Sequence, residues 1–247
     1  MIHKILKSIF VATLLTICAI SAEAAEKAIG SVSAISGEAY AMNEDGSRVD
    51  LALKSPIFQN QTVVTGQDGK VQIIFIDNSI FTISANTELL IDEYVYNDET
   101  QQGKSIMNAT KGVFKFVTGK IAKNNREEVK VNTPFATIGV RGSGGIIAVD
   151  PIAGTRVGLT QCCLDVQTPG GSIPVALDQM GTFIEVQDPD QPAPQPKPVD
   201  ASFSRIIQEN FNADFGQDDG SENPLELNNE QANNDGASQK QDRKEER

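Results

Sequence analysis

Residues 25–187 carry a repeating pattern of short apolar runs separated by turn residues. The runs are rich in β-branched and aromatic residues and recur at intervals of about 8 to 12 residues, which is typical of strands. Examples are VQIIFI at 71–76, VFKFV at 113–117 and FIEV at 183–186. Apolar and polar positions alternate at 129–132, which places one strand face inward and the other outward. The pattern predicts an all-β fold of many short antiparallel strands, arranged as a β-sandwich or as a solenoid-like β stack.

The pattern changes after residue 187. Residues 188–200 contain the proline-rich sequence DPDQPAPQPKP and are expected to form an extended, solvated linker. Residues 201–216 place an apolar side chain at every fourth position, which predicts an amphipathic helix. Residues 217–247 contain few large apolar side chains and are expected to be a disordered acidic tail.

The charge and composition of the chain argue against several classes of function. The chain has 33 acidic and 21 basic residues, and 14 of the acidic ones lie in residues 188–247. A net charge of −12 disfavours nucleic-acid binding, which requires a basic surface. His3 is the only histidine, so a histidine-based catalytic triad or metal site is not expected. We predict no catalytic residues, no metal site and no cofactor.

The amino terminus resembles an export signal. Lys4 and Lys7 precede an apolar stretch at residues 8–20, and an A-x-A cleavage pattern ends at Ala24. Residues 1–24 are therefore expected to be a signal peptide that directs the chain across the inner membrane into the periplasm or the extracellular space. No second long apolar run follows, so no transmembrane helix is expected in the mature chain.

Several ordered motifs resemble those of the FecR family of periplasmic sensor domains. Gly37-Glu-Ala-Tyr40 and the run VQIIFIDNSIFTI at 71–83 match the family pattern, and VNTPFATIGVRGS at 131–143 matches it most clearly. The resemblance predicts a FecR-like β domain at residues 25–150, with residues 151–187 extending the same domain. It implies envelope sensing or signalling through protein contacts. Well-known members carry a cytoplasmic anti-sigma segment and a membrane helix; because a signal peptide stands in their place, this chain is similar to the stand-alone exported branch.

Two sets of side chains are candidates for binding. Arg141 lies between two apolar runs, where it either satisfies backbone carbonyls or contacts an acidic partner. The helix stripe either docks on the chain's own β domain or enters a groove of an envelope protein partner. The candidate partner-binding residues are Arg141, Phe203, Ile207, Phe211 and Phe215.

A basic stretch is a candidate site for an anionic glycan or lipopolysaccharide. Lys111 and Lys115 have the parity to share one face of a strand, and Lys120 and Lys123 follow. The alternatives are attraction of the acidic tail and a solvated face without a ligand.

Cys162 and Cys163 are adjacent, and three interpretations are open. On a regular strand their side chains point to opposite faces, which favours ordinary packing residues with one cysteine inward and one outward. The others are a vicinal disulfide and a bridge between chains.

Taken together, the residues predict an exported, non-enzymatic, protein-binding module in envelope sensing or signalling. The alternative is a structural β protein of the envelope or the extracellular space. A hydrolase is disfavoured because adjacent carboxylates, such as Asp92 and Glu93, point to opposite faces of a strand.

Overall fold

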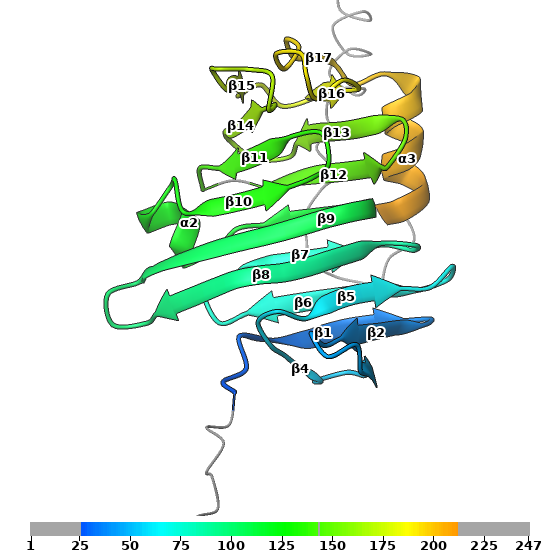
Figure 1. Ribbon diagram of the computed structural model, residues 1–247, viewed down its shortest axis with the longest axis vertical. Helices are drawn as coiled ribbons and strands as arrows, with labels where there is room; N and C mark the ends of the chain where they lie inside the picture. The colour runs from blue at the N-terminus through cyan, green and yellow to red at the C-terminus, as the bar shows by residue number, and fades with distance from the viewer. Residues whose placement is uncertain (1–25, 143, 212–247) are drawn as a thin grey trace, which may run out of the picture.

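The computed structural model describes residues 26–142 and 144–211. Two face-to-face β-sheets form the body, and one strand belongs to both (Figure 1). In spatial order, sheet A contains β4 (Pro56–Ile57), β1 (Gly30–Ser36), β6 (Lys70–Phe75), β7 (Ile80–Ile83), β9 (Gln102–Val117), β12 (Gly144–Asp150), β13 (Gly154–Leu159), β16 (Thr182–Val186) and β17 (Lys197–Pro198). Sheet B contains β3 (Arg48–Asp50), β2 (Ala39–Met42), β5 (Thr62–Thr65), β8 (Glu88–Asn97), β9 again, β10 (Val129–Asn132), β11 (Thr137–Val140), β14 (Leu164–Gln167) and β15 (Val175–Leu177).

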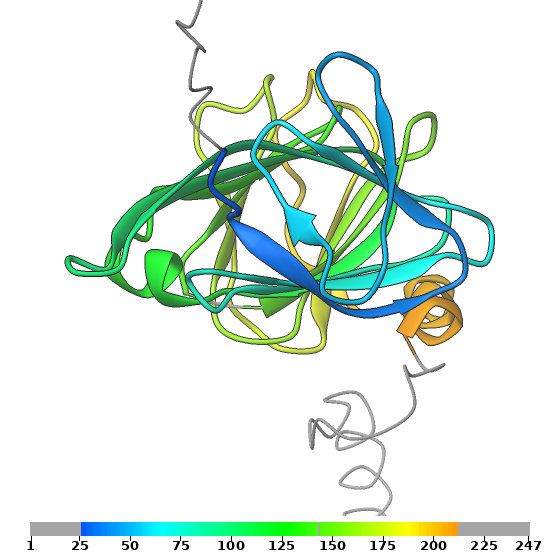
Figure 2. The same ribbon diagram turned by 90° about the horizontal axis from the view of Figure 1, so that it is seen from below.

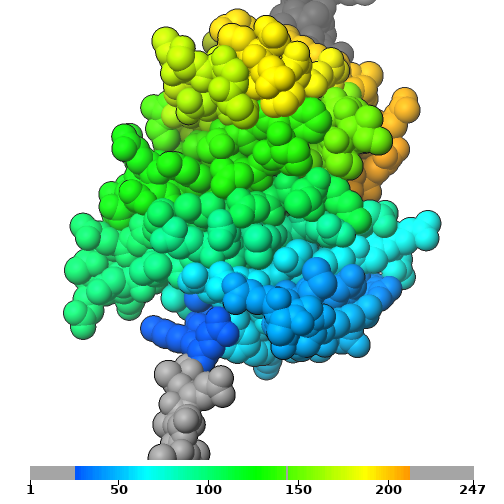
Figure 3. Space-filling view, in the orientation of Figure 1, coloured from blue at the N-terminus to red at the C-terminus, as the bar shows by residue number. Residues whose placement is uncertain are grey.

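The strands follow one another along the long axis nearly in chain order. The colours of Figures 1 and 3 change steadily from the blue β1 end to the yellow β17 end. The strand pairs are antiparallel except β9 with β10, which is parallel. The predicted all-β class is therefore confirmed, and the arrangement combines two packed sheets with a progressive stacking of strands.

Strand β9 crosses from one sheet to the other at Gly112. Its first part pairs with β8 in sheet B, and its last part pairs with β7 and β12 in sheet A. Gly112 has φ +99°, and a Cβ at this position would collide with Thr87. Glycine is thus required where the strand bends, because only glycine adopts this conformation without a steric cost.

The core lies between the two sheets and contains a cluster of aromatic rings. The ring centroid of Phe81 lies 5.4 Å from that of Phe75 and 5.7 Å from that of Phe116. Tyr94 stacks on Phe75 at 5.0 Å. These side chains are almost fully buried, so they contribute much of the apolar area removed from water on folding.

A buried carboxylate occupies the hairpin turn at Asp77-Asn78, between β6 and β7. Asn78 has φ +68°, as a tight turn requires, and Asp77 is only 1% exposed. The Asp77 carboxylate accepts hydrogen bonds from the Tyr94 hydroxyl at 2.7 Å, from the Ser79 amide at 2.9 Å and from the Ser79 hydroxyl at 2.8 Å. It also accepts one from the amide of Ile121 in helix α2 (Lys120–Asn124), at 3.3 Å. The turn, strand β8 and helix α2 are therefore joined at one buried group.

Tyr94 makes the stability of the protein sensitive to alkaline pH. Burial of its hydroxyl, and then the Asp77 charge, raise the pKa of Tyr94 above its ordinary value. In the unfolded chain a tyrosine loses its proton at about pH 10, whereas the Tyr94 hydroxyl of the folded protein keeps its proton at this pH. The contribution of Tyr94 to the free energy of unfolding is therefore constant below about pH 10 and falls above it, by at most about 1.4 kcal/mol per pH unit.

We expect Tyr94→Phe to be less stable than the wild type at neutral pH, but its free energy of unfolding should decline less steeply between about pH 10 and 11 in urea titrations. Equal slopes for the two proteins would contradict this.

The proline-rich segment differs from the expected solvated linker. The hydroxyl of Thr168 donates to the carbonyl of Gln191 at 2.6 Å, and Ala193 is only 6% exposed. Lys197 and Pro198 form β17 at the edge of sheet A. Backbone carbonyls of the segment thus have partners on the β domain, so the segment packs on the domain and holds the following helix close to it.

Helix α3 (Ala201–Phe211) covers part of the outer face of sheet A. Figure 2, seen along the stack, shows the helix outside the two sheets. Asp200 caps its first turn: the Asp200 carboxylate accepts a hydrogen bond from the Phe203 amide at 2.8 Å, and this bond lowers the pKa of Asp200. The predicted helix is confirmed over this span. Phe215, residues 1–24, for which a signal peptide is predicted, and residues 217–247, for which a disordered tail is predicted, lie outside the described residues.

Across residues 26–142 and 144–211, none of the helices has the length and apolar character needed to cross a membrane.

Candidate partner-binding surface

The apolar stripe of α3 faces the protein's own β domain. Phe203 is fully buried and stacks on Phe183 of β16 with ring centroids 4.8 Å apart. Gly158 of β13 provides the space, since a Cβ there would lie 2.5 Å from the Phe203 ring. Ile207 is 6% exposed in the same cluster. Docking on its own domain is therefore the arrangement present, and Phe203 and Ile207 are covered while the helix is docked.

The carboxyl-terminal end of α3 is held by polar contacts as well. The Ser84 hydroxyl donates to the side-chain oxygen of Asn210 at 2.6 Å. Phe211 is half-buried, and the Lys70 ammonium lies 5.9 Å from its ring centroid. The helix thus spans from β16 to the β6–β7 end of sheet A.

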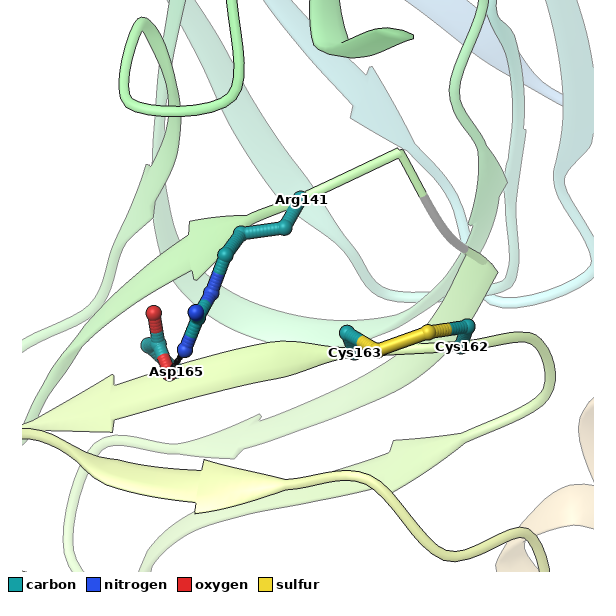
Figure 4. The surroundings of a disulfide bond; sticks show 4 residues. All are labelled: Arg141, Cys162, Cys163 and Asp165. Atoms are coloured by element: carbon teal, nitrogen blue, oxygen red, sulfur yellow. Dashed lines mark hydrogen bonds and ion pairs between the residues drawn. A yellow bond between two sulfur atoms is a disulfide. The ribbon is translucent and has the colours of Figure 1, made fainter.

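Arg141 lies just after β11 and keeps an exposed guanidinium. Its Nη2 forms an ion pair with the Asp165 carboxylate of β14, the strand that pairs with β11 (Figure 4). The Arg141 side chain remains 43% exposed and that of Asp165 22%. Of the two roles that the sequence leaves open for Arg141, contact with an acidic group is present here, and that group is a carboxylate of the same chain. An exposed ion pair of this kind contributes little to stability, about 0 to 1 kcal/mol.

The adjacent cysteines close a disulfide with each other. They lie in the bend between β13 and β14 and not within a regular strand, and Cys163 has φ +68°. Of the three interpretations, the vicinal disulfide is the one present, and the favoured one, ordinary packing residues on a regular strand, is wrong. The favoured interpretation assumed the alternation of a strand, which the bend does not have.

The four candidate lysines do not gather on one face. Lys111 lies on sheet B and pairs with Glu88 at 2.8 Å, whereas Lys115 lies opposite Thr82 in sheet A. The expectation that their parity places them on one face is wrong because the bend at Gly112 separates them. Lys120 pairs with Asp98 at 3.2 Å, and Lys123 lies in the last turn of α2. Binding of an anionic glycan or lipopolysaccharide by these lysines stays a prediction.

The described part of the chain holds no group of three or more His, Cys, Asp or Glu side chains placed to bind a metal ion. The polar groups that sequence reasoning missed are Asp77 and Asp165. The Asp-Asn-Ser sequence at 77–79 is a local turn signal that could have indicated the hydrogen bonds to Ser79. No local signal pairs Asp165 with Arg141, because their approach depends on the β11–β14 register.

Several solved structures are similar to parts of this chain. Two crystal structures of a provisionally assigned anti-sigma factor from Parabacteroides distasonis ATCC 8503 match with TM-scores of 0.42 and 0.44 and 16% identity; the matches cover 57% and 59% of this chain and 61% and 63% of that one. The chain thus spans less than two thirds of the length of these proteins. A structure described as a cell surface anchoring domain matches at 32% identity and TM-score 0.25, over 25% of this chain and 82% of that one. No curated protein matches the sequence.

The family comparison is more direct. Residues 61–161 match the family described as FecR protein, a span that includes Asp77, Arg141 and the strands from β5 to β13. The resemblance predicted from the sequence is therefore confirmed over residues 61–161.

Proposed function

We propose that this chain is an exported, non-enzymatic FecR-like module that binds a protein partner in envelope sensing or signalling. The observation that carries the proposal is the FecR match at residues 61–161. The A-x-A pattern at residues 22–24 supports export across the inner membrane into the periplasm or beyond.

Arg141 is the favoured contact residue within the matched region. Its guanidinium is exposed on sheet B, away from the helix that covers sheet A. Arginine is enriched at protein interfaces because its planar fork binds a carboxylate with two hydrogen bonds. The partner surface is therefore expected to present an acidic group.

A charge-swap experiment tests this contact. The double variant Arg141→Asp/Asp165→Arg keeps an ion pair on β11 and β14 but moves the positive charge to the other strand. We expect crosslinking in intact cells to recover a discrete envelope partner with the wild type and to lose at least tenfold of it with the double variant. Lys54→Glu, an exposed charge reversal near β4 at the opposite end of the stack, serves as the matched control and should retain the partner.

Equal recovery with the wild type and the double variant would contradict a contact through Arg141. If the wild type crosslinks only to its own copies, the structural envelope role is supported instead.

A further inference from the structure

The disulfide between Cys162 and Cys163 joins neighbouring residues in the bend between β13 and β14 (Figure 4). Cys162 is exposed and Cys163 is half-buried. A reagent in solution therefore meets the Cys162 side of the bridge first.

This disulfide does not serve to hold the fold together. A disulfide stabilises a protein mainly by restricting the unfolded chain, and the effect grows with the number of residues enclosed. The bridge encloses no segment, because its sequence separation is one. The bend is held by backbone hydrogen bonds instead: the amides of Thr160 and Gln161 both donate to the Gly144 carbonyl at 3.1 Å. The bridge is thus expected to matter for chemistry and not for global stability.

The bridge does constrain the local backbone. Cys163 has φ +68°, a left-handed conformation that is unfavourable for a residue with a Cβ. While the ring is closed, Cys163 is held in place, and its carbonyl accepts a hydrogen bond from the Arg141 amide at 3.3 Å. Asp165, the ion-pair partner of Arg141, follows two residues later. Opening the ring removes one constraint on the segment that positions Arg141.

We propose that Cys162–Cys163 is a thiol–disulfide exchange site whose substrate is a thiol, and that its redox state controls the order of the bend and of Arg141. A thiolate attacks the sulfur of Cys162, so that a new S–S bond forms as the Cys162–Cys163 bond breaks. The bonding electron pair leaves on the sulfur of Cys163, which takes a proton from water. A second thiolate then attacks the sulfur of the first thiol, which is bound to Cys162. This step forms the disulfide of the two reductant thiols and releases Cys162 as a thiolate, so two electrons pass from the two thiols to the cysteine pair.

The thiol can come from two sources, and the experiment separates them. One arm uses reduced glutathione as a small thiol, and the other uses a reduced thioredoxin-type protein dithiol. The exported protein is purified from the envelope, and free thiols are counted by alkylation and peptide mapping. Cys18, the third cysteine of the sequence, lies in the segment that is expected to be removed on export, so mapping follows Cys162 and Cys163.

We expect the exported protein to carry both sulfurs oxidised and at least one arm to reduce them while the protein stays folded. Amide hydrogen exchange at 141–142 and 160–165 should rise at least tenfold on reduction. The thermal midpoint should move by no more than about 2 °C, because little global stability depends on the bridge.

Two single variants locate the reactive sulfur. Cys163→Ser leaves the exposed Cys162, which should form a mixed disulfide with oxidised glutathione at least tenfold faster than Cys163 does in Cys162→Ser. Equal rates would overturn the assignment of Cys162 as the attacked sulfur. Free thiols in the exported protein, or a bridge that neither arm reduces before unfolding, would overturn the exchange site itself. These outcomes do not depend on a protein partner, so they are distinct from a failure of the proposed function.

Discussion

Replacing Asp77 by alanine is expected to lower the free energy of unfolding by about 3 to 5 kcal/mol. The variant removes a side chain that is 1% exposed and leaves the Tyr94 hydroxyl, the Ser79 hydroxyl and the Ile121 amide without their acceptor. Hydrogen bonds to a charged group contribute about 1.5 to 3 kcal/mol each, and a buried donor without a partner adds a desolvation cost. Urea titration of the purified protein measures the loss.

The effect should reach beyond the turn itself. Besides the carboxylate contacts, the Asp77 carbonyl accepts a hydrogen bond from the Lys120 amide at 2.8 Å, at the start of α2. We therefore expect hydrogen exchange in α2 to rise together with that of the β6–β7 turn.

Asp92→Asn is the matched control for Asp77→Ala. Asp92 is exposed on β8 and accepts a single side-chain hydrogen bond, from Asn108 at 2.9 Å. Its replacement should cost less than about 0.5 kcal/mol. Similar losses at Asp77 and Asp92 would show that the buried network does not stabilise the fold.

The fold class could be predicted from the sequence because strand alternation is a local signal. The run VQIIFI at 71–76 predicted a strand, and β6 at Lys70–Phe75 confirms it. The faces of Lys111 and Lys115 could not be predicted from their spacing, because β9 changes sheet at Gly112, between the two lysines. That change depends on which strands lie on either side, and pairing between distant segments leaves no local pattern.

The candidate site shows the same division between local and long-range information. The four-residue spacing of Phe203, Ile207 and Phe211 predicted the helix and its apolar face. Whether that face meets its own domain or a partner depends on Gly158 and Phe183, which lie far away in sequence. Cys162 and Cys163 were expected on a regular strand, but they lie in a bend. The left-handed conformation of Cys163, with φ +68°, breaks the alternation of a strand.

Replacing Phe203 by alanine is expected to release α3 from sheet A. The side chain is fully buried between Phe183 and Gly158, and such a truncation costs about 3 to 5 kcal/mol when the surroundings cannot close the cavity. A loss of about 3 kcal/mol corresponds to roughly a hundredfold increase in the population of the undocked helix. Hydrogen exchange of the α3 amides measures this increase directly. Gln208→Ala, on the exposed side of the same helix, is the matched control and should leave the exchange nearly unchanged.

A substitution on the sheet tests the same contact from the other side. In Gly158→Val the new side chain occupies the place of the Phe203 ring, so this variant alone should also undock the helix. In the double variant the valine fills part of the cavity that Phe203→Ala leaves, and we expect a total loss at least about 1 kcal/mol smaller than the sum of the two single losses. Additive losses would mean that Phe203 and Gly158 do not contact each other, and the helix would then have to be held by Asn210 and the proline-rich segment instead.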